Sequence, residues 1–428
     1  MYKNRKFFRT CKISRYKFSR LRKLSLEDTI LSTLSRKGKT LKMDVRNYFI
    51  GRNRDISMTR QGYTKQRLNL NPESFKFLNS KHVEHIYTYE DELETKKGYL
   101  VFAVDGSDIL LPTTPTTLAI YGNTSRKDVK EVAQGSLSCI YDVFNKINLQ
   151  ACFNRNKYSE RQSLKDGFNE ISGLIEDKDI IVIMDRNYFS LEMLYYFMHN
   201  LKKSFIFRLR DKDLLNEKKQ MTGNDEMVEI ILDKARINMY RKKEIYSKFE
   251  EIKSMKARMV KYKLNTGEIE YLLTDLSADE FDTDEIGELY FGRWHIETSY
   301  DLLKNNLQLE NFTGKLPQLI EQDIYATLYL SNLVQDCIWE AESKNKKEDK
   351  YRKYKYKMKV NQNMTIGIIK EDLIKVILEE DEEKKKNGYL KMIEEIRKNI
   401  IPIRPGRSNQ RNKNPKRQKY PMNKKKSF

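Results

Sequence analysis

The sequence predicts a mixed α/β protein in which one sheet is flanked by helical regions at both ends of the chain. Residues 99–104 and Ile180–Met184 are continuous apolar runs, as in strands that are buried on both faces. Residues 136–144 and 147–153 are predicted to form a hairpin, with its turn at Asn145-Lys146. Helices and strands alternate after this hairpin, and that order favours a mixed sheet.

The alternation of predicted helices and strands after the hairpin is interrupted once. Residues 159–174 and 190–200 have helical periodicity, and 205–209 is a further apolar strand. Between 211 and 275, short β-like runs alternate with charged stretches, which predicts an inserted β-rich subdomain. Helical periodicity returns at 283–307.

The first part of the chain is predicted to be a small helical unit. Ser25 is the N-cap of a first helix, a second helix covers Leu41–Gly51, and a third begins at Asn71-Pro72. Residues 58–70 are rich in Arg, Lys, Gln and Thr, as expected of a helix that enters a DNA groove. The alternative is an ordinary three-helix bundle with a solvated face.

The charge of the chain predicts a polyanionic partner. The 82 Lys and Arg against 61 Asp and Glu give a net charge of +21 at pH 7, which favours nucleic acid first and an acidic membrane second. A lysine-rich solvated surface would give the same composition. No apolar run reaches the roughly 18 residues of a membrane span, and no apolar segment of a secretory signal follows the basic N-terminus. The four cysteines lie too far apart to suggest a zinc or disulfide framework, so a cytoplasmic protein is expected.

Four residues of the predicted helix at 283–307 suit a phosphate-handling surface. At about 100° per residue, they fall within an arc of roughly 60° on one helical face. They are Tyr290, Arg293, Glu297 and Lys304. The carboxylate can hold a metal ion while the cations bind phosphate oxygens. The alternative is a surface helix with an Arg293–Glu297 ion pair.

Two aspartates favour the first interpretation. Asp105 and Asp185 each follow a predicted buried strand, at the rim of a sheet where ligands of α/β proteins bind. A helix packed across the sheet would bring Glu297 to them. Three carboxylates in one place imply cations, and oxygen ligands favour Mg²⁺ or Mn²⁺. Two such ions can activate a water or a DNA 3′-OH. Any one strand-end Asp among 61 acidic residues can be coincidence, but the joint pattern is harder to dismiss.

The residues around these acids resemble those of a known family. The Tyr-Arg-Glu-Lys signature of bacterial insertion-sequence transposases, the insertion sequence four family, is matched with its spacing by Tyr290, Arg293, Glu297 and Lys304. Asp105-Gly-Ser is similar to that family's first catalytic Asp region, and Asp185-Arg-Asn-Tyr to its second. The resemblance spans about 20–420, including an Arg-Pro-Gly-Arg stretch at 404–407.

The resemblance implies an RNase H-like core with a β-rich insertion before the helix that carries Glu297. It implies that Asp105, Asp185 and Glu297 are catalytic and bind two Mg²⁺ or Mn²⁺ ions. DNA phosphates would be contacted by Tyr290, Arg293 and Lys304. The implied reaction is cleavage at a transposon end, followed by attack of the freed 3′-OH on target DNA. The implied partners are double-stranded DNA, as terminal inverted repeats and as target, and a second copy of the chain in a synapsed dimer at the bacterial nucleoid.

Other interpretations stay open at this point. Asn187 stands where the family usually has Gly or Ala, so one alternative is a relic that binds DNA without cutting it. A metal-dependent nuclease of the same fold, which cleaves without joining, is another. A basic RNA-binding protein is a third, although no motif of stacking aromatics is visible. Trp294, beside the signature, is predicted to be a core residue rather than a base-flipping wedge.

Together these patterns divide the chain into six predicted segments. They are a basic arm at 1–24, a helical DNA-binding domain at 25–95, an RNase H-like catalytic core at 98–210 and 276–316, the inserted β-rich subdomain at 211–275, a C-terminal helical region at 317–400 and a basic tail at 401–428.

Overall fold

The computed structural model describes residues 5–14, 16–19, 23–52, 54, 56–89, 93–124, 131–264, 267–352 and 354–403. Most of the predicted basic tail, with the Arg-Pro-Gly-Arg stretch, lies outside the described residues. The chain divides into two compact units. The sheet unit comprises Val83–Asp108 and Ser136–Tyr300, and the helical unit comprises Met1–His82, Ile109–Gly135 and Asp301–Phe428.

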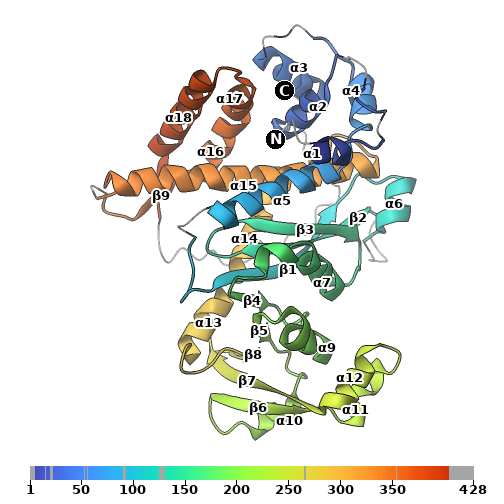
Figure 1. Cartoon of the computed structure of the whole chain (residues 1–428), viewed down its shortest axis with the longest axis vertical. Helices are drawn as coiled ribbons and strands as arrows, with labels where there is room; N and C mark the ends of the chain where they lie inside the picture. The colour runs from blue at the N-terminus through green and yellow to red at the C-terminus, as the bar shows by residue number, and fades with distance from the viewer. Residues whose placement is uncertain are drawn as a thin grey trace. The chain divides into compact units, whose positions relative to one another are not determined.

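One mixed sheet organises the sheet unit (Figure 1). Within the described residues its eight strands follow the order β3 (Asn148–Arg155), β2 (Gln134–Asp142), β1 (Leu100–Leu110), β4 (Ile180–Met184), β5 (Ser204–Arg208), β8 (Ile269–Thr274), β7 (Ser254–Lys263) and β6 (Asp225–Ile231). Strands β1, β4 and β5 run parallel, whereas β5, β8, β7 and β6 pair antiparallel. The last three strands come from the predicted insertion, so that segment continues the sheet.

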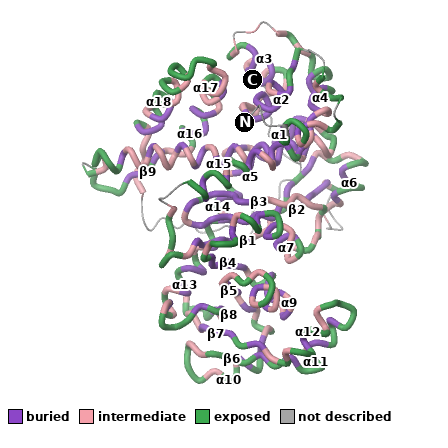
Figure 2. The backbone as a smooth tube through the Cα atoms, in the orientation of Figure 1, coloured by how far each residue is buried: buried purple, intermediate pink, exposed green. Residues whose placement is uncertain are grey.

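The central strands of the sheet form the core of this unit. Every residue of β4 is buried, as are residues 100–104 of β1, and Figure 2 shows both segments as buried. Phe197 and Phe207 pack edge to face with ring centroids 5.5 Å apart. In chain order, the helices of this unit are α7 (Glu160–Glu170), α8 (Ser172–Ile175), α9 (Leu191–Tyr195), the π-helix η1 (Tyr196–Leu201), α10 (Leu215–Gln220), α11 (Lys234–Ile237), the 3₁₀-helix η2 (Asn238–Tyr240), α12 (Ile245–Ile252), α13 (Thr283–Phe291) and α14 (Trp294–Asp301).

The helical unit is built around α15 (Pro317–Lys347), against which helices from both ends of the chain pack. Its other elements are α1 (Arg5–Thr10), α2 (Leu26–Leu34), α3 (Leu41–Gly51), α4 (Arg60–Arg67), most of α5 (Glu73–Tyr89), α6 (Pro115–Tyr121), the π-helices η3 (Leu302–Asn306) and η4 (Ile369–Leu373), α16 (Gln362–Ile368), α17 (Ile374–Leu378), α18 (Glu382–Lys398) and the paired strands β9 (Met358–Val360) and β10 (Ile400–Pro402). Although α15 has 31 residues, neither it nor any other described helix is apolar enough to cross a membrane.

A buried ion-pair network joins α4 to α15 within the helical unit. The carboxylate of Asp323 lies 2.8 Å from Arg67 Nη2 and 2.9 Å from Arg36 Nη1. Both Arg67 and Asp323 are fully buried. Arg67 belongs to the segment that was expected to enter a DNA groove, and here it has a structural role. Arg60 and Lys65 of the same helix remain exposed.

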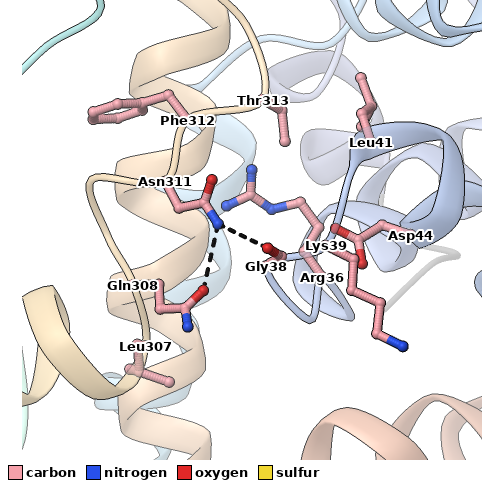
Figure 3. A pocket seen from close by; sticks show the side chains of 10 residues that line it. All are labelled: Arg36, Gly38, Lys39, Leu41, Asp44, Leu307, Gln308, Asn311, Phe312 and Thr313. Carbon is pink, nitrogen blue, oxygen red and sulfur yellow. Dashed lines mark hydrogen bonds between the residues drawn. The ribbon is translucent and has the colours of Figure 1, made fainter. Parts of the chain in front are cut away.

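The loop between α2 and α3 meets residues 307–313 at a small pocket (Figure 3). The Asn311 side-chain amide donates hydrogen bonds to the Gly38 carbonyl (3.0 Å) and to Gln308 Oε1 (3.4 Å). Gly38 has a φ of +75°, and a Cβ there would lie 1.9 Å from Gln308 Oε1. The left-handed backbone favours glycine at this position, and a Cβ would also displace the end of the Gln308 side chain.

Two predicted element boundaries are wrong. Strand β1 does not end at Asp105 but continues to Leu110, because only its pairing with β4 stops at Val104 while β2 remains its neighbour on the other side. The single helix predicted over 283–307 is broken at Gly292, between α13 and α14. Glycine has low helix propensity, and a Cβ at Gly292 would lie 3.2 Å from the side chain of Val143. The chain therefore turns where the sheet approaches it closely.

Candidate active site at the ends of the parallel strands

The two predicted aspartates emerge from neighbouring parallel strands. Val104 pairs with Met184 at the end of the β1–β4 ladder, so Asp105 and Asp185 follow side by side. Neighbouring strands lie about 5 Å apart in a sheet. Register alone therefore brings these two carboxylates to one place.

Glu297 is connected to Asp105 by a shared contact with Arg293. Arg293 Nη1 lies 3.5 Å from Asp105 Oδ2, and Arg293 Nη2 lies 3.0 Å from Glu297 Oε1. Only 7% of Arg293 is exposed. One buried guanidinium thus joins an acid of the sheet to an acid of α14, and Arg293 lies directly after the break at Gly292 that the sequence did not predict.

The backbone around Asp105 is firmly held. The single O–H of Tyr300 is shared between the carbonyl oxygens of Asp105 (2.8 Å) and Leu137 (3.1 Å). The Gly106 N–H donates to Asp105 Oδ1 at 2.8 Å. The carboxylate is therefore positioned from both its side chain and its main chain.

The site carries an excess of negative charge. Burial raises the pKa of Asp105 to about 6; the charges of Glu160 and Asp185 add to the rise, whereas the Gly106 N–H and Arg293 oppose it. A carboxyl group whose pKa is raised in this way lies where a further cation would be stabilised.

Tyr290 and Arg293 have donors that are not used within the described structure. The Tyr290 hydroxyl and Arg293 Nε are buried and make no hydrogen bond. Burial raises the pKa of Tyr290 to about 12, with Arg293 opposing, so its hydroxyl stays protonated at neutral pH. Unsatisfied buried donors are uncommon and suit an anionic ligand such as a phosphate. The fourth signature residue, Lys304, lies on η3 in the helical unit.

Arg208 and Glu270 also belong to this region, and the sequence did not single them out. Phe207 of β5 pairs with Met184, so Arg208 comes level with Asp185. Arg208 Nη2 lies 2.8 Å from Glu270 Oε1. Arg208 could have been named from the sequence, because it is the last residue of an apolar strand. Asp105 and Asp185 were named for a similar reason, since each follows an apolar run.

Asn187, the departure from the family pattern, is accommodated in the turn after β4. Its φ is not left-handed. The side-chain oxygen of Asn187 accepts a hydrogen bond from Arg210 Nη2 (3.0 Å), and its carbonyl accepts from Arg161 Nε (3.1 Å). Asparagine thus makes its own contacts at this position.

Trp294 was predicted to lie in the core, and that prediction is wrong. The side chain is 40% exposed, with the Arg293 guanidinium 5.6 Å from its ring centroid. Trp294 is the first residue of α14, directly after the break between α13 and α14.

Comparison with known proteins assigns the family. The family described as "Transposase DDE domain" matches residues 96–333, more than half of the chain. The chain belongs to the DDE transposase family. This confirms the resemblance to insertion-sequence transposases at the level of the family.

Two transposases and one solved structure illustrate the range of similarity. Transposase InsG of insertion sequence element IS4, from Escherichia coli (strain K12), is 25% identical over 243 residues, which are 56% of this chain and 52% of InsG. The DDE transposase described here thus matches about half the length of that relative. The transposase of insertion sequence element IS421, from Escherichia coli, is 36% identical over 67 residues, 16% of this chain and 18% of that protein. A piggyBac transposase synaptic complex with hairpin DNA aligns with a TM-score of 0.42 and 10% identity, over 89% of this chain and 76% of that one.

DDE transposases generally use divalent metal ions, and the donors at this site fit such ions in kind. Asp105, Asp185 and Glu297 offer only hard oxygen ligands. Burial is the main cause of the raised pKa of Asp105, and the charges of Glu160 and Asp185 add to it. Among the described residues, no three acidic, imidazole or thiol side chains are close enough to share one ion. Arg293 is the cation that lies between Asp105 and Glu297 in this arrangement.

Proposed function

We propose that this chain cuts DNA at the ends of a transposon and joins the freed 3′-OH to target DNA. The observation that carries the proposal is that Asp105 and Asp185 directly follow the last paired residues of two adjacent parallel strands, with Arg293 joining Asp105 to Glu297. Family membership supports the same reaction class.

In this proposal, one set of residues binds metal ions and another set binds DNA phosphates. Asp105, Asp185 and Glu297 would hold two Mg²⁺ or Mn²⁺ ions. When bound, these ions would activate a water or a 3′-OH and stabilise the leaving oxygen. Tyr290 and Arg293 would donate to phosphate oxygens with the donors that are otherwise unused.

Lys304, the last residue of the Tyr-Arg-Glu-Lys signature, is proposed as a further phosphate contact. The substrate would be double-stranded DNA, as terminal inverted repeats and as target. The net charge of +21 supports a polyanionic substrate. A homodimer is proposed because two transposon ends must be held together for joining.

The test is cleavage and joining of DNA that carries the gene's own flanking ends. With Mg²⁺, the full chain should nick at the end and join the 3′-OH to a target plasmid. Glu297→Gln should lower both rates by about 10²-fold or more. Glu288→Gln is the matched control, because Glu288 is exposed on α13 and should leave both rates unchanged.

Two results would contradict the proposal. Tight binding of the ends with no cleavage in Mg²⁺ or Mn²⁺ would indicate a DNA-binding relic. Cleavage without any joined product would indicate a nuclease. Asn187, the residue that suggested a relic, makes hydrogen bonds in the turn after β4 with Arg210 and Arg161.

A further inference from the structure

A short segment of the helical unit, residues 350–359, interleaves cationic and aromatic side chains. It runs from just after α15 into β9 and reads Lys-Tyr-Arg-Lys-Tyr-Lys-Tyr-Lys-Met-Lys. Six of its residues are Lys or Arg, three are Tyr, and none is acidic. All but Lys353 belong to the described residues. Like charges this close together repel one another, and a polyanionic partner would remove that repulsion.

Both ends of this Tyr-Lys segment are fixed to the helical unit. At its start, the Tyr351 hydroxyl donates a hydrogen bond to Glu342 Oε2 of α15 at 2.6 Å. At its end, Met358 and Val360 are buried, and β9 pairs with β10. The residues between are thus carried on the surface by two anchored ends.

The side chains between these anchors are exposed. Tyr354 is 39% exposed and Tyr356 is 49% exposed, so two aromatic rings two residues apart are open to solvent. Lys355 Nζ lies 5.8 Å from the ring centroid of Tyr356. The exposed cations of the segment are Arg352, Lys355, Lys357 and Lys359. Within the described part of the chain, these three lysines make no ion pair with an acid.

The basic tail of the chain starts beside the same segment. Pro402 of β10 pairs with Met358 of β9, and the Ile403 N–H donates to the Lys357 carbonyl at 2.7 Å. Residues 404–428, which lie outside the described residues, carry ten Lys or Arg and no acid in the sequence. The chain therefore enters its tail at the place where the exposed tyrosines and lysines lie.

We propose that the Tyr-Lys segment binds single-stranded DNA, with Tyr354 and Tyr356 stacked on unpaired bases and the intervening cations on phosphates. Aromatic side chains within a cationic surface are the usual means of binding a single strand, because each ring needs a base that is free to stack on it. This surface goes beyond the proposed function, since it uses none of the site acids. Only the choice of DNA over RNA rests on the proposed function.

An acidic membrane is the other polyanionic surface that such a segment could meet. Membrane-surface segments combine cations with exposed aliphatic or large aromatic residues that enter the lipid. Here the two aliphatic side chains nearest the cations, Met358 and Val360, are buried. Exposed tyrosines among lysines therefore fit a nucleic acid strand better than lipid.

Binding of fluorescein-labelled oligo(dT) of about 20 nucleotides to the full-length chain tests this surface, by fluorescence anisotropy in EDTA. A double variant, Tyr354→Leu with Tyr356→Leu, keeps apolar bulk but removes both rings, and we expect it to weaken binding by about tenfold or more. The matching double Tyr→Phe variant keeps the rings and should bind like the wild type. Tyr89→Leu is the control, because Tyr89 is 70% exposed but is followed in the sequence by three acids.

The phosphate contacts have a separate readout. Lys355→Gln with Lys357→Gln should make the dependence of log K on log salt shallower, by about 0.7 for each phosphate contact that is lost. Lys384→Gln with Lys386→Gln is the control, since both lysines are exposed on α18 close to two glutamates. Circular dichroism of each variant checks that it is folded.

Four results would overturn the assignment. They are unchanged oligo(dT) affinity in the Tyr→Leu variant, equal weakening in the Tyr→Phe variant, equal weakening for an oligo(dT)·oligo(dA) duplex, and tyrosine-dependent binding that favours oligo(U) or phosphatidylserine vesicles over oligo(dT). Tyrosine-dependent binding of oligo(dT) by a chain that fails to cleave DNA would support the surface and count against the proposed function. Cleavage and joining with oligo(dT) affinity indifferent to both tyrosines would do the reverse.

Discussion

Arg293 is the residue on which the charge balance of the site depends. Its guanidinium contacts two of the three predicted metal ligands and is almost fully buried. Without a metal ion it is the cation that offsets Asp105 and Glu297. When cations and a DNA phosphate are bound, the same group would be free to bind the phosphate.

Replacement of Arg293 should therefore destabilise the metal-free protein. Arg293→Gln leaves Asp105 and Glu297 without their shared cation, and we expect the free energy of unfolding to fall by about 1–3 kcal/mol. Mg²⁺ should then stabilise the variant more than the wild type. Thermal unfolding in EDTA and in Mg²⁺ measures both effects. Arg186→Gln, at an exposed neighbouring position, is the control; equal stability of Arg293→Gln and wild type in EDTA would refute the idea.

Asp142 predicts a pH dependence of stability. It is fully buried and accepts hydrogen bonds from the Tyr87 hydroxyl (2.5 Å) and the Asn145 N–H (2.9 Å). Burial raises its pKa from 3.8 to about 6, although these hydrogen bonds oppose the rise. Because the folded pKa is the higher one, its contribution is fully present below pH 3.8 and is lost as pH rises through about 6.

Asp142→Asn removes this titration. Relative to wild type, the variant should gain about 2–3 kcal/mol in stability as pH rises from 4 to 7. Chemical denaturation across this pH range measures the difference, with the exposed Asp279→Asn as control. A constant difference between Asp142→Asn and wild type would show that Asp142 does not titrate in this range.

At the scale of single elements, the contact at Gly38 makes the clearest prediction. Gly38→Ala places a methyl group against Gln308 in a left-handed backbone conformation. We expect it to destabilise the helical unit by about 1–3 kcal/mol. Gly51→Ala is the control in the same unit, because a Cβ there meets nothing within 4 Å; in a helix it should raise stability slightly. Thermal unfolding of the two variants compares them, and a melting temperature of Gly38→Ala equal to that of wild type would refute the contact.

The elements show what could be predicted from the sequence. Strand β4 has the predicted ends, Ile180–Met184, because a strand buried on both faces is a continuous apolar run. The helix that carries Glu297 was predicted as continuous, because the spacing of apolar residues does not reveal a break at a glycine. The break at Gly292 lies beside Val143, a residue far away in the sequence. The helices α10–α12 inside 211–275 were missed, since that segment was predicted as β-rich.

The candidate site residues remain a prediction, and most of them were named from the sequence. Strand ends pointed to Asp105 and Asp185, and spacing pointed to Glu297. Glu160 could not be found in this way, because an acid in the first turn of a helix is also what favourable helix-dipole interaction produces. Only the folded chain shows that Glu160 lies against Gly106, the residue after Asp105.

At the scale of the whole molecule, the charge distribution predicts how DNA binding depends on salt. The first 24 residues and the last 27 each carry ten Lys or Arg and no acid. The logarithm of the DNA association constant should fall linearly with the logarithm of salt concentration, with a slope of about 0.9 per phosphate contact. A chain that lacks residues 404–428 should show a shallower slope, as measured by fluorescence anisotropy. Equal slopes would exclude the tail from the DNA contact.

The central claim is that Asp105, Asp185 and Glu297 act as one catalytic unit, and single-turnover cleavage by single and double variants tests it most directly. We expect Asp105→Asn, Asp185→Asn and Glu297→Gln each to lower the rate of end cleavage by about 10²-fold or more, and any two together to lower it little further. Rate losses that multiply in the double variants, or wild-type cleavage by any one of the three single variants, would contradict it.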